Sequence, residues 1–311
     1  MKAIQTFSVM AILFSFTSQV EAKKVNLRYQ LKAGSQFRLE QIITEDIEQG
    51  SEAELMNSKS INSTTYEFNV AEVSANGDMK IDVALKAFSI ESSGPQFGDM
   101  KYNSIDKTAV PDFASDKAVL LDQVYSFTLS PLGAITDIKA PPGILEKMRK
   151  ILEDAGVAKF GFDIEAGIKE FEGPALNKTL KLMLMPFPEG GTEVNVPWKM
   201  EIESHPELMV SNFLLDMKLI RSSGTSSEIE VSAKIGPKNN MPAKEMFGMK
   251  YSFEFSGDRS GSLVLEPKTG LSTKAEFKTL LKGAIIISSS QNTIPTSIPM
   301  TIRATEKITK L

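Results

Sequence analysis

Alternation of apolar and polar residues with a period of two is the feature that most constrains this chain. Phe37 and Leu39 flank a single polar residue near the N-terminus, and Ile229, Val231 and Ala233 repeat the pattern near the C-terminus. Successive side chains of a strand point to opposite faces, so this pattern predicts strands with one buried and one solvated face. We therefore expect a mainly β protein.

The turns between these segments, and the breaks in their phase, predict how the strands are joined. Asn76-Gly77 suits the positive φ of a tight hairpin, and such short links leave no room for the crossover helices of a parallel sheet. The apolar phase shifts after Val70 and again after Ala87, which indicates bulges and bent strands. The sequence predicts one or more long, bent antiparallel sheets.

A central segment, residues 141–186, has helical periodicity instead. Its apolar positions recur every three or four residues, and Gly173-Pro174 interrupts the second stretch. These positions are Ile144, Leu145, Met148, Ile151, Leu152, Ile164, Ile168, Phe171, Leu176, Leu180 and Met183. Each helix has a single apolar stripe, so we expect the helices to pack against the buried face of the sheet, giving an α+β fold.

Residues 1–22 have the pattern of a secretory signal peptide. Lys2 is followed by an apolar stretch and by Val20-Glu21-Ala22 as a cleavage site. The alternative, a buried first strand or helix, fits less well because a new pattern begins at Lys23. The apolar stretch is shorter than the roughly 20 residues that span a bilayer. We expect an exported, periplasmic or extracellular protein without a membrane-spanning segment in its mature chain, and without a lipid anchor because no cysteine stands at the cleavage site.

Residues 23–311 are predicted to form one β-rich unit. Two similar Pro/Gly turns, residues 129–135 and 265–271, suggest a division into pseudo-repeats over 23–140 and 187–311, joined by the helical segment 141–186. A chance similarity between two turn sequences explains the same observation. Both interpretations stay open.

Composition excludes several classes of function. The 311 residues include 35 Lys and Arg against 39 Asp and Glu, a net charge of −4. Nucleic-acid binding relies on clustered Lys and Arg, so we expect no such partner. The chain has no cysteine and one histidine, which removes disulfides, thiolate chemistry and most metal sites. We expect no metal and no cofactor.

Two sequence patterns are candidates for catalytic sites. Ser104 and Lys107 match Ser-x-x-Lys, and residues 268–270 match Lys-Thr-Gly, the pair that frames the active site of serine β-lactamases. The serine must begin a buried helix for that chemistry, yet its surroundings predict a loop. His205 stands before a proline, in a context that favours an exposed turn. We expect no catalytic residue and a non-enzymatic protein.

Methionine usage is the remaining functional signal. Flexible thioethers line cavities that accept variable apolar ligands, and they also fill ordinary cores. The candidates for lining an apolar ligand site are Met183, Met185, Met241, Met246, Phe247 and Met249.

Six short segments form a series along the mature chain. They are residues 29–37, 73–78, 102–104, 128–133, 186–188 leading to Trp198, and 267–270. In this order they resemble an uncharacterised family of exported bacterial β-rich proteins and lipoproteins, a domain of unknown function. The resemblance covers essentially the whole mature chain and implies no catalytic residue.

Three functions remain as hypotheses. The first is a carrier or sensor of lipid or other apolar molecules in the cell envelope, because long curved strands with helices across one face resemble the lipoprotein-carrier architecture. The second is an envelope scaffold or protein-binding module that uses a sheet edge or an apolar patch on an envelope protein. A serine acyl-enzyme using Ser104 is a distant third.

Overall fold

The computed structural model describes residues 24–51, 54–95, 98–156, 164–204, 211–236, 244–246, 249–289 and 295–311. Its strands are β1 (Gln36–Gln49), β2 (Met56–Val73), β3 (Met79–Ser93), β4 (Met100–Asn103), β5 (Val124–Leu129), β6 (Ile135–Lys139), β7 (Pro197–Ser204), β8 (Ser211–Ser222), β9 (Ser227–Ile235), β10 (Lys244–Met246), β11 (Met249–Leu265), β12 (Ser272–Ser289) and β13 (Thr296–Lys310). Its helices are η1 (Asp112–Ala114), α1 (Ser115–Ala118), α2 (Ile144–Asp154), α3 (Ile164–Phe171) and α4 (Pro174–Met183).

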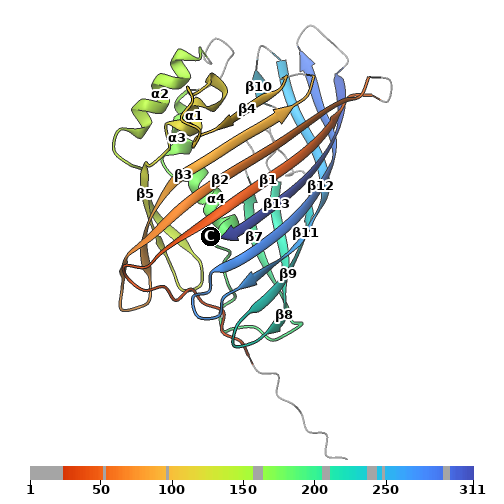
Figure 1. The fold of residues 1–311 in the computed structure, drawn as a ribbon. Coiled ribbons are helices and arrows are strands. Elements are labelled where there is room, and N and C mark those ends of the chain that lie inside the picture. The colour runs from red at the N-terminus through yellow and green to blue at the C-terminus, as the bar shows by residue number, and fades with distance from the viewer. Residues whose placement is uncertain are drawn as a thin grey trace, which may run out of the picture.

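Within these residues the strands form one antiparallel sheet that curves around α4 (Figure 1). The order is β6-β5-β3-β2-β1-β13-β12-β11-β9-β8-β7, with β4 beside β3 and β10 beside β11. The first and last long strands are therefore neighbours at the centre, where β1 pairs with β13. The predicted long, bent antiparallel sheet is confirmed.

The two faces of the sheet differ in polarity, as the alternation predicts. The inner face, toward α4, carries Leu39, Phe68 and Phe277, each at most 1% exposed. The outer face carries charged pairs such as Arg38 with Glu67. On α4, Leu180 and Met183 are buried against the inner face. The prediction that the helices pack against the sheet is thus confirmed for α4, whereas the main contacts of α2 are with α1 and α3.

An extended N-terminal segment, residues 24–31, lies between the two similar turns. The Tyr29 amide donates to the Pro131 carbonyl at 2.8 Å, and the Gln30 amide donates to the Thr269 carbonyl at 3.0 Å. The approach is close enough that a Cβ at Gly270 would lie 2.2 Å from the Arg28 carbonyl oxygen. Both Pro/Gly turns thus hold the same segment.

Most predicted elements are confirmed, including the break between α3 and α4 at Gly173-Pro174. The alternation of Val194, Val196 and Trp198 predicts a strand from Val194 onward, and that start is wrong. Val194 and Val196 are 42% and 47% exposed, and β7 begins only at Pro197. The reason is local, because Asn195 has a φ of 66° and turns the chain there. The division into pseudo-repeats stays a prediction, and residues 1–23 lie outside the described part.

Candidate functional site

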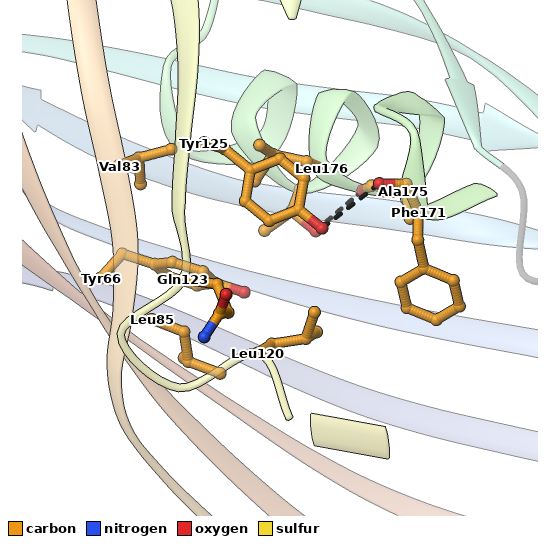
Figure 2. A pocket seen from close by; sticks show the side chains of 10 residues that line it. Tyr66, Val83, Leu85, Leu120, Gln123, Tyr125, Phe171, Ala175 and Leu176 are labelled. Carbon is orange, nitrogen blue, oxygen red and sulfur yellow. Dashed lines mark hydrogen bonds between the residues drawn. The ribbon is translucent and has the colours of Figure 1, made fainter. Parts of the chain in front are cut away.

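A partly open cleft of about 120 Å³ lies between the inner face of the sheet and the ends of α3 and α4 (Figure 2). One wall consists of Tyr66 from β2, Val83 and Leu85 from β3, and Tyr125 from β5. Leu120 and Gln123, from the segment before β5, lie beside Leu85, and the helical wall consists of Phe171, Ala175, Leu176 and Thr179. None of these ten residues is charged, so the cleft suits an uncharged apolar group.

The polar atoms in the cleft are neutral as well. The Tyr125 hydroxyl donates to the Phe171 carbonyl oxygen at 3.2 Å, a bond that joins the sheet to the end of α3 (Figure 2). Burial raises the pKa of Tyr125 above its ordinary value and raises the pKa of Tyr66 to about 12. Both hydroxyls therefore stay protonated at neutral pH. Gln123 and Thr179 add uncharged hydrogen-bonding groups.

Two irregularities in the chain bring the cleft residues together. A register shift between β2 and β3 at Thr65/Tyr66 changes the direction in which neighbouring side chains point. On the opposite wall, Pro174 begins α4 immediately after α3 has ended, because proline is tolerated only in the first turn of a helix. One helix thus contributes Phe171 and the next contributes Ala175 and Leu176.

The size of the cleft limits what it can hold. Buried apolar cavities of ~150 Å³ bind benzene in other proteins, and this cleft is slightly smaller at about 120 Å³. It therefore admits a group about the size of one aromatic ring or the end of an alkyl chain. The rest of a larger ligand would extend through the open side.

The structure places the methionine candidates in two separate regions. Met183 and Met185 are 2% and 4% exposed and border a void of only about 10 Å³, beside Leu263 and Leu265. Met246 pairs with Met249 at the opposite end of β11. Met241 and Phe247 lie outside the described residues, as does the side chain of Met246. Their role in lining a ligand site stays a prediction.

The cleft residues themselves were not identified from the sequence. Tyr66 and Tyr125 match the ordinary alternation of core residues in strands. The signals that could have pointed to them are the phase shift after Ala87, which lies opposite the register shift at Tyr66, and the helix break at Gly173-Pro174. Irregularities of this kind often lie beside binding sites.

Ser104 lies in the loop after β4, as expected. Its hydroxyl accepts a hydrogen bond from the Phe88 amide at 2.9 Å, which extends the pairing beyond the end of β4. The Lys268 motif forms the turn between β11 and β12. His205 lies outside the described residues.

The helices and the acidic side chains of the described residues bear on membrane spans and metal sites. None of their helices has both the length and the apolar character needed to cross a membrane. Among the same residues, no group of three or more His, Cys, Asp or Glu is placed to hold a metal ion.

A family model shows which protein family the chain belongs to. A model described as a family of unknown function (DUF6263) matches residues 76–272, which is more than half of the sequence. The chain belongs to this family. The matched region includes every cleft residue except Tyr66. Among curated proteins, none matches.

A solved structure named "Lipid-protein interactions in lipovitellin" has a similar fold. The TM-score is 0.51 at 10% sequence identity, and the alignment covers 90% of this chain but 25% of that one. The chain thus spans about a quarter of the length of lipovitellin. At this identity the similarity concerns the fold alone.

Proposed function

We propose that the protein binds apolar molecules in the cell envelope as a carrier or sensor, without catalysis. The observation that best supports this proposal is the uncharged cleft of about 120 Å³. It opens beside a buried core and is lined by apolar side chains and neutral hydroxyls. The similarity to a lipovitellin fold, seen in a structure described by its lipid–protein interactions, supports a lipid as the ligand. Export through residues 1–22 belongs to the same proposal.

The test is to fill the cleft. The Ala175→Phe variant adds a ring to one wall, and Glu172→Phe is the matched control because Glu172 is exposed nearby. With the dye N-phenyl-1-naphthylamine as ligand, we expect Ala175→Phe to weaken binding by about tenfold, equal to ~1.4 kcal/mol, and the control to bind normally. Organic extraction followed by mass spectrometry should recover lipid from the wild-type protein. Equal dye binding by both variants, with a lipid-free extract, would contradict the proposal.

A protein-binding role is the second candidate. Ile105, Val110 and Phe113, in the segment that follows β4, are 67%, 46% and 38% exposed. Exposed apolar side chains close together often mark contact sites for partners. If this role is correct, an Ile105→Ser, Phe113→Ser double variant should lose the envelope protein captured by the wild-type chain in a pull-down, while dye binding in the cleft is unchanged.

A further inference from the structure

The inner face of the sheet has a second apolar region, beyond the part that α4 covers. Pairing across the strands places Leu281 opposite Ile302, and places Ile285 opposite Ile298 on one side and Phe253 on the other. We call Leu281, Ile285, Ile287, Phe253, Ile298 and Ile302 the upper inner face. It lies toward the ends of β11, β12 and β13 that are far from Phe277.

The burial of its side chains indicates that most of this region is a sheet with no second layer of structure packed on its inner face. Phe277, on the part that α4 covers, is 1% exposed, and Ile302 at the near end of the upper inner face is still only 5% exposed. Farther along the same strands, Ile285 and Ile298 are only half-buried. Ile286, on the outer face, is half-buried too. Residues beneath a second layer would be fully buried on that side. Within the described residues, therefore, no covering layer lies over the outer part of the upper inner face.

Glycines make this part of the sheet curve. A Cβ at Gly283 would lie 1.9 Å from the Glu254 carbonyl oxygen, and a Cβ at Gly257 would lie 1.8 Å from the Leu280 carbonyl oxygen. Only glycine allows the neighbouring strands to coil this closely. The upper inner face is therefore concave, as the curvature of the long strands in Figure 1 also indicates.

A polar belt separates the upper inner face from the core below. The Gln41 side-chain amide donates to Glu306 at 2.6 Å, and Glu306 also forms an ion pair with Arg259. The Arg259 guanidinium lies 4.5 Å from the centre of the Phe277 ring. The charges of the belt cancel, so it offers no net charge to attract an ionic head group.

We infer that the upper inner face binds the two acyl chains of a glycerophospholipid, with the head group at the open rim of the sheet. Six residues along β12 and three strands across give roughly 20 Å by 14 Å, or ~280 Å². A stable dimer buries ~800 Å² on each partner, so the area is too small for a second copy. It is wide enough for two hydrocarbon chains, which the cleft beside α4 could not hold.

The absence of cysteine makes a direct test available. Ile285→Cys places one thiol on the upper inner face, and Ile286→Cys places one on the outer face as a matched control. The rate of reaction with a maleimide is measured with and without vesicles of dioleoylphosphatidylcholine. With lipid at about ten times its dissociation constant, only the free protein reacts, so we expect the Ile285→Cys rate to fall by about tenfold. The Ile286→Cys rate should stay within about twofold.

The alternatives give different results. Equal rates for Ile285→Cys with and without vesicles would overturn the inference. Slow reaction without lipid that becomes faster on dilution would overturn it in favour of a second copy, and slow reaction at every protein concentration would mean that the chain covers this face itself.

Combining Ile285→Cys with Ala175→Phe separates this site from the cleft. Protection that survives in the double variant supports a distinct lipid surface, even if the cleft proposal fails. Protection that disappears would place the lipid in the cleft and overturn this inference alone.

Discussion

The lower and upper parts of the inner face are built from the same long strands and the same alternation, yet they differ in what lies over them. Below the polar belt, Phe277 and Leu263 are buried with Leu180 of α4 in one core. Above it, Ile285 and Ile298 are half-buried. Apolar residues on a sheet face therefore do not by themselves indicate a core, because the length of the covering helix decides where the core ends.

The polar belt lies on the core side of this change, since Ile302 and Phe255, beyond it on the same face, are still only 5% and 6% exposed. Arg259 and Glu306 have side chains only 12% and 6% exposed, and burying charges costs free energy unless they are paired. Because the belt is neutral and hydrogen-bonded, it can interrupt the apolar inner face without leaving an unpaired buried charge. It also fixes the relative register of β1, β11 and β13, which supply Gln41, Arg259 and Glu306.

The largest expected effect tests the contrast directly. Leu180→Ala should lower the free energy of unfolding by about 4 kcal/mol, because it leaves a cavity in the covered core. Ile285→Ala should lower it by only ~1 kcal/mol, because a half-buried site loses less contact. Urea denaturation measures both. Equal losses would mean that the upper inner face is as well packed as the lower one.

The next effect concerns the belt. Glu306→Ala leaves the Arg259 guanidinium buried without its ion-pair partner, and we expect a loss of about 3 kcal/mol in the free energy of unfolding. Replacing both residues with apolar ones, as in Arg259→Met with Glu306→Leu, should lose much less, since no unpaired charge remains. If the single and double variants are equally unstable, the loss does not come from an unpaired buried charge.

Sequence periodicity was sufficient to predict the sheet but not this boundary. Phe277 and Ile285 have the same phase in β12, eight residues apart, so alternation assigns both to one apolar face. Nothing in that pattern states which of them a helix will cover, because coverage depends on where α4 sits in three dimensions. The sequence did predict the helix break at Gly173-Pro174. This break places the end of α3 and the start of α4 side by side along the cleft.

The candidate site was less predictable for a related reason. Tyr66 and Tyr125 are distant in sequence and come together only because β2, β3 and β5 are successive strands in the sheet. The methionine pattern pointed to a residue type suited to apolar ligands, but Met183 and Met185 fill a core with a void of only about 10 Å³. The methionines indicated the kind of ligand, whereas the order of strands in the sheet determined where the cleft lies.

Alkaline pH should lower the free energy of unfolding through Tyr66, which lies at the edge of the covered region. Burial raises the pKa of Tyr66 from 10.0 to about 12, so the folded state holds the phenol proton more tightly than the unfolded state. The resulting stability is complete below pH 10 and is lost as pH rises from 10 to 12, by about 2 kcal/mol. Urea midpoints measured from pH 8 to 12 should fall less steeply for Tyr66→Phe, and identical slopes would contradict this assignment.

The smallest expected effect concerns the hydrogen bond that crosses the cleft. Tyr125→Phe removes the hydroxyl that reaches the Phe171 carbonyl at 3.2 Å, and we expect a loss of about 1 kcal/mol in the free energy of unfolding. Since that carbonyl lies at the end of α3, the change should loosen the helical wall and leave the upper inner face unaffected. The maleimide rate of Ile285→Cys should therefore be the same with and without Tyr125→Phe. A change in that rate would mean that the two regions are coupled, and that the belt does not isolate them.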